Sequence, residues 1–213
     1  EDANTDELLN TLIGMSGSDN LNKITRMVNW EADSTDILQA SVKGSKIGTQ
    51  LAVSLLEQYR SNMNIGSNSG STNLKVHVIG ISVGAFAADS FVRALHEKSI
   101  SRPGERDHIY LQLTLLDPFQ QKAVLGLGYG NQMFGKGADY AQQYLNTDDP
   151  VPSTNAPLDH CATIDVTSLR PEEVFGHDWP LIYYTQKLQE RQSEEFIPVE
   201  KRKTIGSVEV TQA

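Results

Sequence analysis

Residues 74–95 read LKVHVIGISVGAFAADSFVRAL and contain two different patterns in succession. Residues 74–79 are rich in β-branched side chains and predict a short buried strand. Residues 85–95 are rich in alanine and place apolar side chains at helical spacing. The stretch therefore predicts a strand, a tight turn and a helix, and the rest of the fold can be inferred outward from this unit.

The predicted turn has the pattern G-x-S-x-G, with Ser82 at its centre. A strand, a turn and a helix in this order are the context in which a serine hydroxyl is exposed at the top of a sheet as a nucleophile. We expect Gly80 and Gly84 to relieve crowding around a strained Ser82, and the Val83 N–H to stabilise a developing oxyanion. The alternative interpretation is a glycine-rich turn with an incidental serine.

Composition excludes several classes of protein. The chain has 213 residues, of which 38% are hydrophobic and 21% charged, as in a folded soluble domain with a substantial core. The formal net charge of −9 argues against nucleic acid and anionic membrane surfaces as main partners. No apolar run approaches the length of a transmembrane helix. Cys161 is the single cysteine, so no intrachain disulfide can form.

The two ends of the chain carry further information. The chain begins at Glu1 without an initiator methionine, so we expect a processed protein or a fragment, and the absence of a visible signal peptide leaves export open. Residues 1–192 are expected to form one domain. Residues 193–213 are charged and mostly polar, and they predict a tail in which residues 205–210 could form an edge strand.

Predicted helices and strands alternate along the chain. Helices are expected at about 5–14, 37–59 and 181–191, and strands at 23–30, 109–116, 141–145 and 161–166. Polar loops are expected at 61–73 and 99–107, and the glycine-rich residues 126–137 predict a mobile surface segment. The alternation predicts an α/β fold with a largely parallel sheet and helices on both faces.

Candidate site residues follow the predicted strands. Ser82, Asp117 and Asp149 each come after a strand end, where ligands bind in parallel sheets, and His177 follows later. The order Ser, Asp, His is that of the triad in α/β-hydrolases. Either aspartate could instead be a turn residue stabilised by the proline after it.

Five histidines stand at positions 77, 96, 108, 160 and 177. No two of them have the spacing of metal ligands, so no metal is predicted, and no cofactor motif is present. His177 is the expected general base and His160 the fallback. The alternative for His177 is a solvent-facing residue at the start of a helix.

Several segments, in order from about Asp6 to Lys187, resemble the pancreatic-lipase-type branch of the α/β-hydrolases. Residues 77–85, HVIGISVGA, resemble His-Ile-Ile-Gly-His-Ser-Leu-Gly-Ala, and residues 115–118, LLDP, resemble Gly-Leu-Asp-Pro. Residues 27–30, MVNW, resemble a strand that ends in Val-Asp-Trp, and the helix after them is similar to the family's next helix. The Tyr-Tyr-Thr at 183–185 resembles the same tripeptide after the family's catalytic His.

The resemblance implies a triad of Ser82, Asp117 and His177. Residues 149–152, DPVP, also resemble the Asp-x-Val-Pro of fungal-type lipases, so Asp149 stays open as the alternative acid. The chain departs from the family in several respects: Ile81 replaces a His, and the family's disulfides cannot form.

The family has a strand and an oxyanion loop before its first matched helix, and this chain starts after that point. We therefore expect the N-terminal strands to be missing and the chain alone to be a poor catalyst, because the second oxyanion donor comes from that loop. The open sheet edge beside residues 23–30 is expected to be covered by a cleaved N-terminal segment or a partner chain.

Two classes of function follow from these patterns. The first is a serine esterase or lipase that hydrolyses carboxylic esters of acyl-lipid type without a cofactor. The second is a catalytically silent, lipase-like binding or structural protein, or part of a larger complex. Acyl transfer to an acceptor other than water is a third, weaker interpretation.

Overall fold

The computed structural model describes residues 3–15, 24–28, 36–65, 74–99, 109–124, 126–151 and 153–195. The chain divides into two compact units, one built from residues 28–181 and the other from residues 1–27 together with 182–213. All candidate site residues belong to the larger unit.

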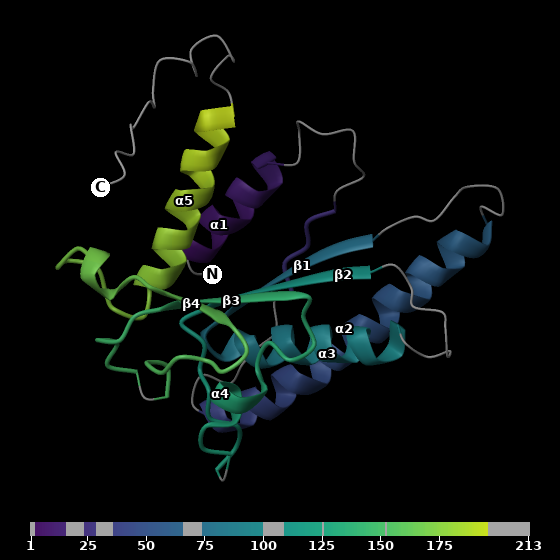
Figure 1. The fold of residues 1–213 in the computed structure, drawn as a ribbon, viewed down its shortest axis with the longest axis horizontal. Helices are drawn as coiled ribbons and strands as arrows, with labels where there is room; N and C mark the ends of the chain where they lie inside the picture. Colours follow the sequence, from purple (N-terminus) through teal and green to yellow (C-terminus); the bar gives the residue numbers. More distant parts are fainter. Residues whose placement is uncertain are drawn as a thin grey trace, which may run out of the picture. The chain divides into compact units, whose positions relative to one another are not determined.

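The larger unit contains a four-stranded parallel sheet, drawn as arrows in Figure 1. Its strands are β1 (Leu74–Ile81), β2 (Ile109–Leu116), β3 (Tyr140–Leu145) and β4 (Ala162–Asp165). Each strand pairs in parallel with the next one along the chain, so the spatial order equals the sequence order. The prediction of an α/β fold with a parallel sheet is confirmed for the described residues, whereas the hydrolase type of fold stays a prediction.

Helices α2 (Ile37–Ile65) and α3 (Ala85–Ser99) lie side by side on the same side of the sheet (Figure 1). Phe86 of α3 is fully buried, as are Leu111 and Leu113 of β2, so the core lies between α3 and the sheet. The two helices approach closely at Gly48, where an added Cβ would overlap with the Ala87 carbonyl group. The expectation that helices cover both faces of the sheet stays a prediction.

The glycine-rich residues 126–137 are partly exposed and partly buried: Leu127 is 75% exposed, whereas Phe134 is fully buried. The expected surface position is therefore correct for only part of the segment, and its mobility stays a prediction. Residues 126–137 include the short helix α4 (Tyr129–Met133), and the ring centroid of Phe134 after it lies 5.0 Å from that of Phe86. At Gly130 an added Cβ would lie 2.8 Å from the Gln120 Cα. Glycine here permits close packing, which composition alone does not distinguish from flexibility.

The strand predicted at residues 23–30 is absent from the part of it that the structure describes. Residues 24–28 lie in no strand, and Ile24 is 74% exposed. A strand needs a partner for its backbone hydrogen bonds, and none of the described strands pairs with this segment. Residues 23, 29 and 30 lie outside the described residues.

Helices α2 and α5 are among those that extend beyond their predicted bounds. Helix α2 continues past the expected end at Tyr59, and the Ser61 hydroxyl donates to the Glu57 carbonyl oxygen at 2.8 Å, so a polar residue is accommodated within the helix. Helix α5 (Trp179–Glu195) exceeds the expected range of 181–191 at both ends. The remainder of the two predicted loops, at 66–73 and 100–107, and the edge strand at 205–210 lie outside the described residues.

The smaller unit contains α1 (Ala3–Gly14) and the part of α5 from residue 182 onward. The Gln189 amide of α5 donates to the Glu7 carboxylate at 3.0 Å and to the Thr11 hydroxyl at 3.2 Å, so the two helices pack together. The single domain expected for residues 1–192 stays a prediction.

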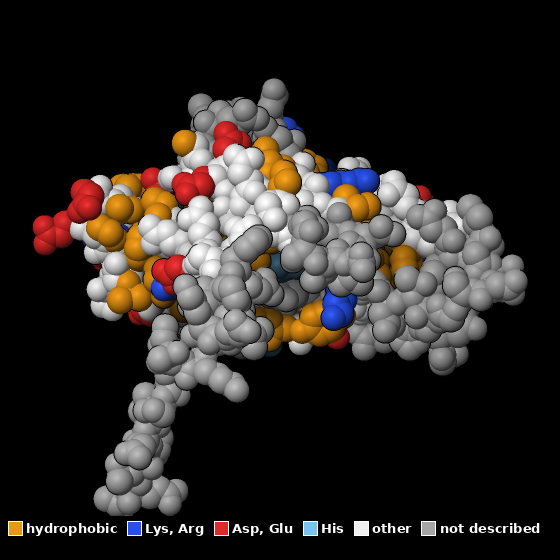
Figure 2. Space-filling view, turned by 90° about the horizontal axis from the view of Figure 1, so that it is seen from above, with side chains coloured by type: hydrophobic (Ala, Val, Ile, Leu, Met, Phe, Trp, Pro, Cys, Tyr) orange, Lys and Arg blue, Asp and Glu red, His pale blue; other side chains and the backbone are white. Residues whose placement is uncertain are grey.

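None of the described helices combines the length and the apolar character needed to cross a membrane. On the face shown in Figure 2, the described Lys and Arg side chains lie in a few separate places. Among the described residues, that face therefore offers no broad basic area of the kind that binds phosphate backbones.

Candidate active site

The G-x-S-x-G motif lies between β1 and α3, as the sequence predicts. Residues Ser82–Gly84 form a single 3₁₀ turn that leads directly into α3. Ser82 has a φ of 49°, in the left-handed region that L residues other than Asn and Asp rarely adopt. The strained strand–turn–helix unit expected around Ser82 is therefore present.

The two glycines of the motif have different surroundings. An added Cβ at Gly80 would lie 2.7 Å from the Ala88 Cβ and 2.9 Å from the Ala85 Cα, so β1 and α3 can meet only without a side chain there. An added Cβ at Gly84 would meet no atom of the described chain within 4 Å. The expectation that both glycines relieve crowding is correct for Gly80 and wrong for Gly84, which has no such contact among the described residues.

This difference predicts the effects of two alanine substitutions. Gly80→Ala should lower the free energy of unfolding by about 1–3 kcal/mol, because the new methyl group overpacks the contact with α3. Gly84→Ala, the matched control, should leave it almost unchanged. Urea unfolding followed by circular dichroism measures both, and equal losses in the two variants would contradict the assignment.

Two backbone hydrogen bonds join the carboxyl ends of β1, β2 and β3. The Phe119 N–H donates to the Ser82 carbonyl oxygen, and the Asp117 N–H donates to the Tyr144 carbonyl oxygen, both at 3.1 Å. Asp117 follows β2 directly and has a φ of 45°, a conformation that Asp tolerates better than most residues. These bonds hold the residues after β2 against the Ser82 turn.

Asp149 lies in the loop after β3 and is held by that loop. Its Oδ1 accepts the Val151 N–H at 3.0 Å, as in an Asx turn, and its Oδ2 accepts the Thr154 hydroxyl at 2.7 Å. Thr154 is fully buried, and sequence analysis did not identify it. Its only sequence signal is a hydroxyl residue shortly after an Asp-Pro turn, which is common in loops.

His177 lies in the turn before α5. The Trp179 indole N–H donates to the Val166 carbonyl oxygen at 2.8 Å, which fixes the start of α5 to the end of β4. The Asn146 side-chain amide donates to the Gly176 carbonyl oxygen at 2.9 Å, so the loop after β3 also supports the turn. His177 is thereby held from two sides.

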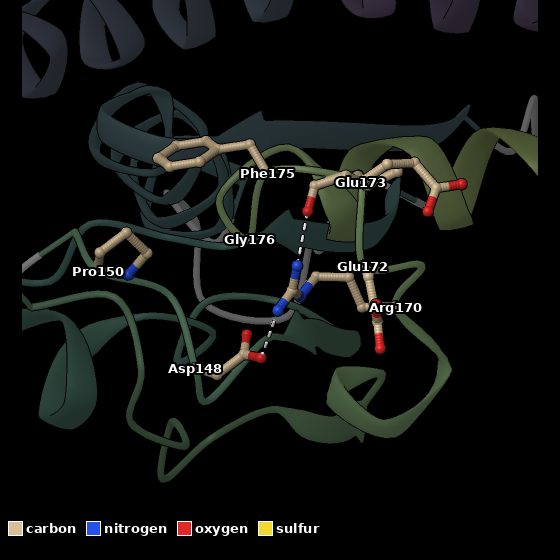
Figure 3. Close-up of a pocket in the computed structure, with 8 residues that line it drawn as sticks. Asp148, Pro150, Arg170, Glu172, Glu173, Phe175 and Gly176 are labelled. Atoms are coloured by element: carbon tan, nitrogen blue, oxygen red, sulfur yellow. Dashed lines mark hydrogen bonds and ion pairs between the residues drawn. The ribbon is translucent and has the colours of Figure 1, made fainter.

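A pocket of about 390 Å³ lies between the loops that carry Asp149 and His177 (Figure 3). It is lined by Asp148, Pro150, Arg170, Glu172, Glu173, Val174, Phe175 and Gly176. The Arg170 guanidinium donates to the Asp148 carboxylate at 2.8 Å and to the Val174 carbonyl oxygen at 2.6 Å, and so links the loops. Because Ser82 does not line it, we assign this region to loop positioning and not to substrate binding.

The side chains of Ser82, Asp117 and Asp149 converge on the His177 ring. His177 Nε2 lies 2.9 Å from Ser82 Oγ. His177 Nδ1 lies 2.6 Å from Asp117 Oδ2 and 2.9 Å from Asp149 Oδ2. Both aspartate side chains are buried, while that of His177 is 20% exposed. The structure thus brings Ser82, His177 and both candidate acids within hydrogen-bond distance of one imidazole.

His160, the fallback base, lies elsewhere. It precedes β4 and is exposed at the amino end of that strand, whereas Ser82 and Asp117 follow the carboxyl ends of β1 and β2. Since all four strands are parallel, these ends lie on opposite edges of the sheet. His160 is therefore not part of the cluster.

No family model, curated protein or solved structure matches this chain. The resemblance to the pancreatic-lipase-type enzymes accordingly rests on the quoted segments. The interpretation of the site rests on its geometry and chemistry, which is the stronger ground because one fold hosts many functions.

The pKa values of the clustered groups reflect burial and mutual contacts. Burial raises the pKa of Asp117 to about 7, and the hydrogen bond with Asp149 acts in the same direction. Burial also acts to raise the pKa of Asp149, but hydrogen bonds from Asp117, Val151 and Thr154 outweigh it and leave that pKa below its ordinary value. Burial acts to lower the pKa of His177, but hydrogen bonds and charges of both aspartates leave it above its ordinary value.

Asp117, Asp149 and His177 also have the residue types of a metal site, and their ligand atoms lie within 4.8 Å of one another. A metal ion at Nδ1 would require that nitrogen without its proton. Distances of 2.6 and 2.9 Å to two carboxylate oxygens are those of a protonated Nδ1 in hydrogen bonds. We therefore assign hydrogen bonding to this cluster, and the expectation of no metal stays a prediction.

Proposed function

We propose that this chain is a serine hydrolase that cleaves carboxylic esters, with acyl-lipid esters as the class implied by the lipase resemblance. The observation that supports this most directly is the 2.9 Å separation of His177 Nε2 and Ser82 Oγ, with carboxylate oxygens at Nδ1. In this arrangement the imidazole can take the hydroxyl proton while an acid holds the ring in the required tautomer.

The proposed reaction has two stages. Ser82 Oγ bonds to the ester carbonyl carbon while His177 Nε2 takes the hydroxyl proton, and the tetrahedral intermediate then releases the alcohol, which receives that proton. Water next bonds to the acyl carbon and gives a proton to Nε2. The bond from this carbon to Oγ breaks, the carboxylic acid leaves, and the proton returns to Oγ.

Negative charge on the former carbonyl oxygen needs backbone donors. Val83 follows the nucleophile in the 3₁₀ turn at the start of α3, where backbone N–H groups lack acceptors within the helix. Its N–H is therefore the proposed oxyanion donor. A second donor normally comes from a loop next to the strand of the nucleophile.

A second candidate function is a catalytically silent, lipase-like binding protein. The observation that favours it is that β1 is an edge strand of the described sheet, so no described strand beyond β1 can supply the second donor. Loss of one donor typically lowers turnover by about 10²–10³. Slow hydrolysis of esters is therefore the result expected of a hydrolase with one oxyanion donor, and no hydrolysis is the result expected of the silent binding protein.

Covalent labelling with a fluorophosphonate probe separates the two candidates. An activated serine displaces fluoride from the phosphorus atom, so we expect a phosphonylated Ser82 in peptide mass spectra. Ser82→Ala should prevent labelling. Ser54→Ala, the matched control, removes an exposed hydroxyl from α2 and should leave labelling intact. An unlabelled wild-type protein would favour the silent alternative.

A further inference from the structure

Two carboxylates face one N–H at His177. When Nε2 accepts the Ser82 proton, Nδ1 carries the single ring proton of the neutral imidazole. That one donor faces Asp117 Oδ2 at 2.6 Å and Asp149 Oδ2 at 2.9 Å. A triad needs only one acid, so the proposed mechanism leaves the second carboxylate unexplained.

The two carboxylates differ in their other contacts. Asp149 accepts hydrogen bonds from the Val151 N–H at 3.0 Å and the Thr154 hydroxyl at 2.7 Å. Asp117 Oδ1 is buried and, within the described chain, has no hydrogen-bond partner. Burial of an ionised carboxylate with few donors is costly, whereas a protonated carboxyl tolerates it better. The surroundings therefore favour charge on Asp149 over charge on Asp117.

The closeness of the two groups points the same way. Two ionised carboxylates at one nitrogen would repel each other, and one proton shared between them removes that repulsion. The pKa of Asp117, raised by burial to about 7, and the lowered pKa of Asp149 agree with a proton on Asp117. Asp148, the residue before Asp149, is already paired with Arg170 at 2.8 Å.

We propose that Asp117 and Asp149 both position His177 and share one proton, so that either carboxylate can hold the ring when the other is lost. This inference rests on the proposed function and adds to it a second positioning acid. Asp117 follows β2 and Asp149 lies in the loop after β3, so the two carboxylates that contact the His177 ring come from different loops of the sheet. In the intact protein Asp149 is the ionised partner and Asp117 the neutral one.

The kinetic test compares Asp117→Asn, Asp149→Asn and the double variant in the hydrolysis of a p-nitrophenyl ester. Asn suits the backbone at 117, because it tolerates a left-handed φ. An amide in place of a lone triad acid costs about ten-thousandfold in turnover. We expect each single variant to lose far less than this factor, and the double variant to lose about all of it. A single variant as slow as the double variant would overturn the inference.

A second measurement needs no turnover. Nitrogen-15 NMR of histidine-labelled protein reports which ring nitrogen of His177 carries the proton, with His177→Gln identifying the signal. We expect the Nδ1–H tautomer in the wild type and in both single variants, and its loss in the double variant. Asp178→Asn is the control, because it makes the same change beside His177 without removing a described hydrogen bond to the ring.

The two measurements keep the inference separate from the proposed function. If no ester is hydrolysed and no serine is labelled, but the tautomers follow the expected pattern, then the function is wrong and the sharing of the ring by two acids stands. If either single variant alone abolishes the Nδ1–H tautomer, the sharing is wrong, whatever the activity.

Discussion

Ser82→Ala is expected to abolish ester turnover while the fold is retained. The substitution removes the hydroxyl that lies 2.9 Å from His177 Nε2 and leaves the turn and its backbone hydrogen bond to Phe119 in place. When a triad acts as a unit, loss of its nucleophile lowers turnover by a factor on the order of a million. Initial rates with a p-nitrophenyl ester measure the loss, and circular dichroism measures the fold.

The control for this variant is Ser54→Ala, which should hydrolyse the ester at the wild-type rate. Unchanged hydrolysis by Ser82→Ala would remove Ser82 as the nucleophile. A loss of helical signal in that variant would instead point to a structural role for the hydroxyl, and a heat-unfolding curve would detect it.

His177→Gln is expected to lower turnover by a factor on the order of a million, because no other described group reaches Ser82 Oγ as a base. His160→Gln is the matched control. His160 is exposed at the amino end of β4, so its loss should leave turnover nearly unchanged. Equal losses in the two variants would contradict the assignment of the base.

The pH profile gives a further check on His177. The base must be neutral, and the pKa of His177 lies above its ordinary value of 6.5, so activity should already decline as the pH falls to that value. The residual activity of His177→Gln should lack this decline. A flat wild-type profile between about pH 5 and 8 would count against a histidine base.

The central unit of the fold could be predicted because several local signals agree there. Residues 74–95 combine a strand rich in β-branched residues, a glycine-containing turn and an alanine-rich helix. Gly80 of this unit is needed for the close packing of β1 on α3. Strand β2 has the bounds expected for it, since an apolar run flanked by polar residues leaves little choice. The rule that ligands bind at carboxyl strand ends then leads to Ser82 and Asp117.

The rest depends on contacts between distant parts of the chain. The sequence left open which aspartate contacts His177, because Asp149 and Asp117 lie 28 and 60 positions before it and the sequence does not give their distances in space. In the structure both aspartates lie within hydrogen-bond distance of the His177 ring. Thr154 could not be identified, since its role comes from hydrogen bonds within one loop, to the Asp149 carboxylate and the Val151 carbonyl oxygen. The burial of Phe134 within residues 126–137 could not be predicted, because Phe86, whose ring packs against it, lies far away in sequence.

Ser82 has a backbone feature with a consequence for directed evolution. Its left-handed φ of 49° is unfavourable by about 1–2 kcal/mol for an ordinary L residue, whereas glycine adopts it without a steric penalty. A library screened for heat resistance alone would therefore enrich glycine at this position. That gain would delete the hydroxyl that contacts His177. Heat resistance and the proposed turnover are opposed at this backbone position, so a screen that ignores turnover would select inactive variants.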